Sequence, residues 1–375
     1  MIMNSELPVL LLTGYLGSGK TTLMNHILKN NKDKHIALIV NDIGEVNIDE
    51  ELIKDSGYIR KEDKGDVVPL SNGCICCTLK TDLLEQLDEL ISSGKFDYIL
   101  IEASGICEPL PIAQTIAVMN DSTRMYGIPD ICRLDNVVTV VDALRMSNEF
   151  NCGNDLLKEN LDEDDIENLL IEQIEFCNVI VLNKVSEVSS DQLNKVKGII
   201  KALQPNAKII ETDYCNVDID EMIDTNNFNL EEASMSAGWI EAFENPEEHE
   251  DGEALEYGID TFVYTSRKPM DLDSFKSIID KHDKSVIRSK GYLYLTENND
   301  NCYVFEKSGK QKVLTEVGKW LAAMDEETKN AILAENPDIQ EIWDEEIGDR
   351  MTKLVFIGKD MDKDSIISDL KSCER

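Results

Sequence analysis

The chain has 375 residues, more than one typical domain needs and enough for two domains that each bury a core. Hydrophobic residues make up 42% and charged residues 30% of it, a globular balance, and no apolar run approaches the roughly 18 to 20 residues of a membrane-spanning helix. Acidic residues outnumber basic ones by 74 to 37, for a formal net charge of -37, which repels nucleic acid and anionic membrane surfaces. We therefore expect neither nucleic acid nor membrane as a partner.

The start of the chain carries no pattern of an export signal. The apolar stretch Val9–Leu12 leads directly into a glycine-rich loop rather than to a small-residue cleavage site, so a cytoplasmic protein is expected. The 10 cysteines of such a chain should be reduced thiols. Cysteines that lie close together are therefore interpreted first as metal ligands.

Short apolar runs rich in β-branched residues recur through the first half of the chain, each short enough for a strand buried on both faces. They are Val9–Leu12, Ile36–Val40, Tyr98–Ile101, Val137–Val141 and Val179–Leu182, with Ala207–Ile210 as a weaker sixth. Helical spacing of apolar residues marks Thr21–Lys29, Thr81–Leu90 and Asp191–Ala202. The alternation predicts an α/β fold of the P-loop NTPase type, with a mostly parallel sheet flanked by helices.

A glycine-rich loop lies between the first predicted strand and the first predicted helix. It reads Gly14-Tyr15-Leu16-Gly17-Ser18-Gly19-Lys20-Thr21-Thr22, the Gly-x4-Gly-Lys-Thr pattern of a phosphate-binding P-loop in its required context. Its glycines let backbone amides surround the phosphates, beside the positive end of the following helix. We expect Lys20 to reach the β- and γ-phosphates and the Thr21 hydroxyl to ligate Mg²⁺. The predicted nucleotide contacts here are Gly14, Gly17, Ser18, Gly19, Lys20, Thr21 and Thr22.

Two acidic turns follow predicted strands, where a residue that holds Mg²⁺ and senses the γ-phosphate is expected. One is Glu102-Ala103-Ser104-Gly105 and the other is Asn41-Asp42-Ile43-Gly44-Glu45. Glu102 and Asp42 are therefore candidate catalytic residues together with Lys20, and Gly105 is a candidate nucleotide contact. For each acid, an ordinary helix cap or surface charge is the open alternative.

Recognition of the base is expected after a later strand, where the aspartate of an Asn-Lys-x-Asp motif pairs with two donors on guanine. This chain has Asn183-Lys184-Val185-Ser186 and lacks the aspartate. Ser186 accepts only a weaker single hydrogen bond, so guanine selectivity needs compensation from Glu187 or a backbone group. Asn183 and Lys184 remain predicted nucleotide contacts. GTP is the expected nucleotide, with ATP or relaxed specificity as the open alternative.

Three thiols occupy four positions in Gly73-Cys74-Ile75-Cys76-Cys77-Thr78, just before the predicted helix near Thr81. Thiolates at this spacing can share one soft or borderline ion, and zinc takes four tetrahedral ligands, which nearby acids or histidines could complete. A metal site explains the cluster better than packing does. Incidental buried cysteines and a redox pair are the alternatives, and most of the scattered cysteines are expected to be small core residues.

The composition changes in the second half of the chain. No basic residue occurs between Lys208 and Arg267, and Glu247–Glu253 concentrates negative charge, which is typical of a linker. Beyond it, the pattern predicts strands at Gly258–Thr265, Tyr292–Thr296, Cys302–Glu306 and Leu354–Ile357, with helical periods at Ser274–Lys281 and Asp325–Glu346. The expected organisation is a P-loop domain at residues 1–225, an acidic linker at 226–256 and a smaller α+β domain at 257–375.

With these elements in order, the chain resembles the CobW-like family of P-loop GTPases, which are relatives of the nickel-handling HypB and UreG proteins. The residues that carry the resemblance are Gly14–Thr22, Asn41–Asp49, Gly73–Leu79, Glu102–Pro109, Asn183-Lys184, Arg288–Gly291 and Gly348–Gly358. The resemblance implies a GTP-dependent metallochaperone or metal-insertion factor that serves a metal-requiring client protein. It implies zinc, or a similar ion such as cobalt or nickel, at Cys74, Cys76 and Cys77.

The Asn41–Asp49 segment resembles a switch region of that family, one that touches both sites, and this resemblance implies Glu45 as a further metal ligand. The chain departs from the family pattern at Asp42, where glutamate is common, at Ser186, and in a linker with acids where many relatives have histidines. No arginine finger or glutamine base is evident, so slow intrinsic hydrolysis is expected. The alternative is a nucleotide-responsive metal sensor or scaffold with little hydrolysis. The oligomeric state is left open by the sequence.

Overall fold

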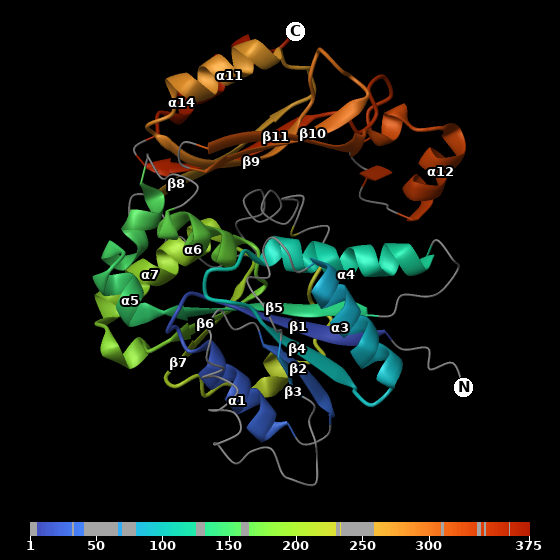
Figure 1. The fold of residues 1–375 in the computed structure, drawn as a ribbon. Helices are drawn as coiled ribbons and strands as arrows, with labels where there is room; N and C mark the ends of the chain where they lie inside the picture. Colours follow the sequence, from blue (N-terminus) through green and yellow to red (C-terminus); the bar gives the residue numbers. More distant parts are fainter. Residues whose placement is uncertain are drawn as a thin grey trace. The chain divides into compact units, whose positions relative to one another are not determined.

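The computed structural model describes residues 6–31, 34–40, 67–69, 80–124, 132–158, 165–229, 233, 259–308, 311–335, 339–340, 343–359 and 361–375. The chain divides into two compact units, Met1–Leu156 with Leu169–Ser234, and Leu157–Asn168 with Met235–Arg375 (Figure 1). None of the helices in these residues is both long enough and apolar enough to span a membrane.

The first unit contains a seven-stranded sheet in which every neighbouring pair of strands is parallel. Its strands are β1 (Leu7–Thr13), β2 (Ile36–Val40), β3 (Val67–Pro69), β4 (Tyr98–Glu102), β5 (Cys132–Asp142), β6 (Val179–Asn183) and β7 (Lys208–Thr212), in the spatial order β3-β2-β4-β1-β5-β6-β7. The helices that alternate with them are α1 (Lys20–Asn30), α3 (Lys80–Ser93), α4 (Pro109–Arg124), α5 (Ala143–Asn148), α6 (Ile166–Glu175) and α7 (Ser190–Leu203). Figure 1 shows α1 and α4 on opposite faces of the sheet. The predicted parallel α/β fold is confirmed.

The apolar runs explain why this sheet forms. Residues 9–12 of β1 are fully buried, as expected of a central strand covered on both faces. Leu23, Met24 and Ile27 of α1 have helical spacing and pack into the same core cluster as strand residues such as Leu10 and Leu100. β7 is an edge strand with mostly exposed or half-buried residues, which explains its weaker apolar signal.

The second unit is built on a five-stranded antiparallel sheet in the order β11-β10-β9-β12-β8. Its elements are β8 (Ile259–Ser266), α11 (Leu272–Lys281), β9 (Val286–Leu293), β10 (Asn301–Ser308), β11 (Gln311–Lys319), α12 (Glu326–Glu335), β12 (Thr352–Lys359) and α14 (Lys363–Ser372). Apolar residues of α11 and α14 join strand residues in one core cluster, and Figure 1 shows both helices over the same face of the sheet. Of the short 3-10 helices, η2 (Val185–Glu187) and η3 (Ile219–Glu221) belong to the first unit, η4 (Leu321–Ala323) belongs to the second, and η1 (Asn151–Leu157) ends at the boundary between them.

The predicted strands of this unit are present, and the expected pairing of the strands near Tyr292 and Cys302 is confirmed by the antiparallel register of β9 and β10. Two details differ. β9 spans Val286–Leu293 rather than Tyr292–Thr296. Of the helical period predicted from Asp325, α12 covers Glu326–Glu335 and residues 339–340 are again helical. β11 was not predicted, because most of its residues are polar and its valines are exposed, so it lacks a strong apolar signal.

Candidate nucleotide site

The glycine-rich loop lies at the carboxyl end of β1 and leads into α1, as its sequence predicts. Gly14 has a backbone φ of 133°, and a methyl group there would lie 2.4 Å from the carbonyl oxygen of Val140. Gly19 has a φ of 118°, and a methyl group there would lie 2.6 Å from Nδ2 of Asn183. Both positions therefore require glycine, for backbone conformation and for space.

The first turn of α1 is open to an anion. Gly19 caps the helix without a side-chain hydrogen bond, and the first turn carries no acidic residue, so its positive end is not neutralised from within the helix. Lys20 is buried and its Nζ donates to the carbonyl oxygen of Tyr15 at 3.4 Å, which places the ammonium over the loop. Ser18 is also buried, whereas Thr22 is exposed. The lysine and the helix end together form a positively charged cradle for phosphate.

Thr21 and Glu102 come together from separate elements. Glu102 is the last residue of β4, is buried, and lies in register with Leu12 of β1 and Val40 of β2. The Thr21 hydroxyl donates to Oε1 of Glu102 at 3.0 Å. A hydroxyl and a carboxylate are hard oxygen ligands of the kind that Mg²⁺ prefers. These two residues therefore fit a Mg²⁺ ion bound beside the phosphates.

The turn after β4 packs directly against the glycine-rich loop. The Ala103 backbone N–H donates to the carbonyl oxygen of Leu12 at 2.9 Å. A methyl group on Gly105 would lie 2.7 Å from the backbone nitrogen of Leu16. From behind, the buried Gln173 of α6 donates to the carbonyl oxygen of Cys107 at 3.1 Å. A displacement of this turn should therefore also displace the phosphate loop.

The Asn183-Lys184 pair holds the other side of the loop. Asn183, at the end of β6, donates from Nδ2 to the Ser18 carbonyl oxygen at 2.9 Å and accepts at Oδ1 from the Cys215 backbone N–H at 3.2 Å. Lys184 adopts a left-handed backbone with a φ of 62°, and its Nζ donates to the Gly17 carbonyl oxygen at 3.2 Å and forms an ion pair with Asp142. The two residues thus connect the phosphate loop to the loops that follow β6 and β7.

Sequence reasoning missed Arg145, which contacts the loop from α5. Its Nη1 donates to the Leu16 carbonyl oxygen at 2.6 Å, and its guanidinium lies 4.3 Å from the ring centroid of Tyr15. Asp142 caps α5 by accepting from the Arg145 backbone N–H. A lone arginine three residues beyond a strand end carries no motif, so only its position after β5 could have suggested it. Gln173 and Asp213 were missed as well; Asp213 accepts from Ser186.

The predicted metal-site residues Cys74, Cys76, Cys77 and Glu45, and the candidate acid Asp42, lie outside the described residues. Within the described ranges, no group of three or more histidine, cysteine or acidic residues could hold a metal ion. The scattered cysteines form no disulfide within the described residues, and all are buried except the half-buried Cys152, which agrees with their expected place in the core. Burial raises the pKa of the Cys177, Cys215 and Cys302 thiols to about 12.

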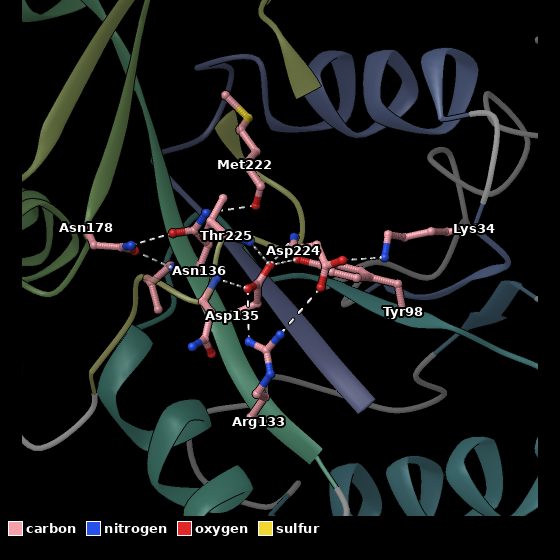
Figure 2. A network of polar contacts seen from close by, with 11 residues as sticks. Lys34, Tyr98, Arg133, Asp135, Asn136, Asn178, Met222, Asp224 and Thr225 are labelled. Atoms are coloured by element: carbon pink, nitrogen blue, oxygen red, sulfur yellow. Dashed lines mark hydrogen bonds and ion pairs between the residues drawn. The ribbon is translucent and has the colours of Figure 1, made fainter. Parts of the chain in front are cut away.

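A second polar cluster lies at the opposite, amino edge of the same sheet (Figure 2). Asp135, near the start of β5, is fully buried and accepts at Oδ1 from Nη1 of Arg133 at 3.0 Å. Its Oδ2 accepts from the hydroxyl of Tyr98, the first residue of β4. Three successive backbone N–H groups, those of Asp224, Thr225 and Asn226, also donate to this carboxylate. We call Tyr98, Arg133, Asp135 and residues 224–226 the amino-edge cluster.

The backbone of residues 224–226 is shaped for this contact. Asp224 and Asn226 have left-handed φ values of 60° and 53°, and such alternation turns successive N–H groups toward one anion. These successive N–H groups form an anion-binding nest around the Asp135 carboxylate. The Asp224 side chain lies outside this nest, and its carboxylate accepts from Nζ of Lys34 at 2.8 Å. The anion-binding nest is thus filled by a side chain of the protein itself.

Three features at the carboxyl edge of the sheet define a P-loop nucleotide-binding protein of the α/β class. They are the glycine-rich loop, the buried lysine beside it and the Thr21–Glu102 pair. Residues 8–211 match the model of the CobW/HypB/UreG nucleotide-binding domain, and residues 259–374 match the cobalamin synthesis protein CobW C-terminal domain. The chain therefore belongs to the CobW/HypB/UreG family.

Its relatives include proteins with names that mention zinc. The zinc-regulated GTPase metalloprotein activator 1 of Dictyostelium discoideum is 36% identical over 384 residues, which cover 98% of this chain and 80% of the relative. The zinc chaperone CobW of Pseudomonas aeruginosa is 35% identical over 219 residues, which cover 55% of this chain and 56% of the relative. The solved structure of the Zn(II)-bound YjiA GTPase from E. coli covers 99% of this chain at 21% identity, with a TM-score of 0.47.

Proposed function

We propose that the chain is a GTP-hydrolysing metallochaperone that binds zinc, or a similar divalent ion, through Cys74, Cys76 and Cys77 and delivers it to a metal-requiring client protein. GTP hydrolysis at the P-loop is its enzymatic activity. The hydrolysis cycle changes the grip on the metal, through the Asn41–Asp49 segment and the turn at Glu102–Gly105. The family and the zinc-related names of its relatives support this proposal.

One observation carries the coupling between nucleotide and metal. Val40, the last residue of β2, is in register with Glu102 on one side and with Pro69, the last residue of β3, on the other. Neighbouring strands lie about 4.8 Å apart, so the carboxyl ends of β2 and β3 lie within about 10 Å of the end of β4. The chain leaves these ends toward Asn41–Asp49 and toward the thiol-bearing residues 70–79, which run from β3 to the start of α3.

The described residues divide the work on the nucleotide. Lys20 and the open first turn of α1 stabilise the negative charge of the phosphates. Asn183 and Lys184 hold the loop in its cradle shape through the Ser18 and Gly17 carbonyl oxygens. Thr21 and Glu102 hold Mg²⁺, which when bound neutralises charge on the β- and γ-phosphates. Glu102 connects this chemistry to the neighbouring ends of β2 and β3.

The test of this function combines metal binding with hydrolysis. Wild-type protein and a variant with Cys74, Cys76 and Cys77 changed to serine are compared by competition with a chromophoric chelator and by phosphate release with and without one equivalent of zinc. We expect the triple variant to lose zinc affinity and to hydrolyse GTP at a rate that no longer responds to zinc. Cys152→Ser changes a half-buried thiol outside the cluster, and should behave as wild type.

Two results contradict the proposal in different ways. Zinc affinity that survives the triple substitution refutes the thiol site. A zinc-binding wild type with a hydrolysis rate no higher than that of Lys20→Ala favours the non-hydrolysing sensor or scaffold instead. Delivery to a client is tested separately, by transfer of zinc to an apo-metalloprotein in the presence of GTP and of a non-hydrolysable analogue.

A further inference from the structure

The base-reading part of the nucleotide site has its usual frame but lacks its usual acid. Asn183 and Lys184 are in place against the phosphate loop, yet position 186 is a serine. A serine hydroxyl cannot accept from the two adjacent donors that guanine presents, and a carboxylate can, since it is a pure acceptor with two oxygens. The site is therefore incomplete unless an acid comes from elsewhere.

The structure places the carboxylate of Asp213 beside Ser186. Asp213 follows directly after β7, and Thr212 of that strand pairs in register with Asn183 of β6. Its Oδ1 accepts from the backbone N–H of Ser186 at 3.1 Å and from the Ser186 hydroxyl at 2.9 Å. The serine is thus used as a donor, and the carboxylate that it holds lies beside the position where the motif normally carries its own.

The loop that carries Asp213 is held in shape by a second contact. Tyr214 and Cys215 both have left-handed backbones, with φ values of 55° and 53°, a conformation that costs energy in residues with side chains. The Cys215 backbone N–H donates to Oδ1 of Asn183 at 3.2 Å, which fixes the loop to the same strand end. Asp213 is therefore anchored from both sides, by Ser186 and through Cys215.

One oxygen of Asp213 remains available to a ligand. Both of its hydrogen bonds to Ser186 use Oδ1, and in the part of the chain that the structure describes Oδ2 makes none. The residue is half-buried, so it is positioned and still reachable from solvent. Glu187, the other acid close to the motif, is exposed, and no hydrogen bond of its carboxylate to a described residue fixes it. It serves as the natural comparison.

We propose that Asp213 supplies the base-reading carboxylate that the Asn-Lys-x-Asp motif lacks, and that it gives this chain its preference for GTP over ATP. This inference rests on the proposed GTP-dependent function. Guanine offers N1–H and N2–H donors to a carboxylate, whereas adenine places the N1 lone pair there, which a carboxylate repels. A site of this kind discriminates because the wrong base leaves its buried polar groups unpaired.

The experiment measures the affinities of the full-length protein for GTP, ATP and xanthosine triphosphate by calorimetry in the presence of Mg²⁺. Xanthine has an oxygen at C2 where guanine has an amino group, so an amide side chain suits it better than a carboxylate does. Asp213→Asn should weaken GTP binding about 10- to 150-fold, the range for a hydrogen bond to a charged group. It should at the same time strengthen binding of xanthosine triphosphate, and it should strengthen rather than weaken binding of ATP, because the amide no longer repels the N1 lone pair of adenine.

Two variants make the result specific to Asp213. The exchange of both residues, Ser186→Asp with Asp213→Ser, returns the acid to its usual position in the motif and should restore GTP preference. Glu187→Gln removes the neighbouring exposed charge and should leave all three affinities within about twofold, as expected for a screened surface charge. The gain of xanthosine triphosphate binding cannot come from a misfolded loop, so a merely structural role for Asp213 would not produce it.

The outcomes separate this inference from the proposed function. An unchanged ratio of GTP to ATP affinity in Asp213→Asn overturns the inference, as does a loss of GTP preference in Glu187→Gln. A wild type without any preference for GTP overturns it too. None of these results bears on zinc-dependent hydrolysis, which stands or falls with the three cysteines. Conversely, hydrolysis that ignores zinc refutes the metallochaperone proposal while leaving the base preference of Asp213 intact.

Discussion

The two edges of the parallel sheet each carry a cluster of polar residues, and the two clusters differ in character. At the amino edge, the Asp135 carboxylate is fully buried, and its partners are a phenol, a guanidinium and three backbone N–H groups of the same chain. At the carboxyl edge, Lys20, Asn183 and Lys184 direct their donors at carbonyl oxygens of the glycine-rich loop. The polar groups of the first cluster are paired with one another, whereas the second cluster forms the proposed nucleotide site.

The difference shows how burial and charge should be interpreted. A buried carboxylate whose hydrogen-bond partners all belong to its own chain holds the structure, because removing it leaves several N–H groups without an acceptor. A helix end that lacks both a cap and an acid, next to a lysine, keeps its positive charge for a ligand. Substitutions at the amino edge should therefore change stability, and substitutions at the carboxyl edge should change activity.

The largest effect is expected from Asp135→Ala. Loss of a buried, hydrogen-bonded charge typically costs about 3–5 kcal/mol, because its partners stay buried without it. We expect the free energy of unfolding, measured in urea, to fall by this amount, while the folded protein keeps its affinity for GTP. Asp220→Ala removes an exposed acid in the segment between β7 and residues 224–226. This control should change stability by less than about 0.5 kcal/mol. Equal stabilities for the two variants would contradict the closed character of the amino-edge cluster.

Lys20→Ala should have the opposite effect, a loss of activity with little change in stability. A preorganised donor to the phosphates is worth about 10²- to 10³-fold in rate, or about 2.7–4 kcal/mol. GTP hydrolysis, followed by phosphate release, should fall by this factor, with the melting temperature of the nucleotide-free protein nearly unchanged. Lys29→Ala, at the other end of the same helix, should retain the wild-type rate. A variant at position 20 that is as active as wild type would remove the catalytic half of the comparison.

The two edges also differ in how far the sequence predicts them. The phosphate loop was found because its parts are contiguous and because its own backbone conformation requires glycine, as the φ of 133° at Gly14 shows. The amino-edge cluster was not found, because Asp135 meets partners 89 to 91 residues further along the chain. No local pattern marks such a contact.

The same reasoning explains which other elements and residues could be predicted from the sequence and which could not. Central strands such as β1 were predicted from buried apolar runs, whereas β11 was missed because its valines are exposed. Asp213 was missed because it compensates for Ser186 from a loop 27 residues away. The thiol cluster at Cys74–Cys77 lies outside the described residues and stays a prediction.

A smaller effect is expected where the turn after β4 touches the phosphate loop. Gly105→Ala brings a methyl group within 2.7 Å of the Leu16 backbone nitrogen, so the turn must move by a few tenths of an ångström. Overpacking of this kind costs about 1–3 kcal/mol, and small misplacements at an active site reduce rates. We expect GTP hydrolysis to fall about tenfold, with a modest loss of stability. A wild-type rate of GTP hydrolysis in this variant would show that a shift of the turn does not alter the geometry at the phosphates.

The smallest effect, Tyr98→Phe, tests the closed cluster by its dependence on pH. Burial, with the adjacent Asp135 carboxylate, raises the pKa of Tyr98 well above its ordinary value of about 10. The folded state therefore holds the phenol proton more tightly than the unfolded state, and the stability that this contributes is present below about pH 10 and falls as the pH rises further.

At pH 7 the variant should be less stable than wild type by about 1.5 kcal/mol, the lower range for a hydrogen bond to a charged group. In urea unfolding between pH 7 and pH 11, the two stabilities should converge above about pH 10, because only the wild type has this proton to lose. Tyr214→Phe, which alters a residue that is 83% exposed, should match wild type at neutral pH. Parallel stability curves for wild type and Tyr98→Phe would mean that the phenol does not donate to Asp135, and that the amino-edge cluster is held by its backbone N–H groups and Arg133 alone.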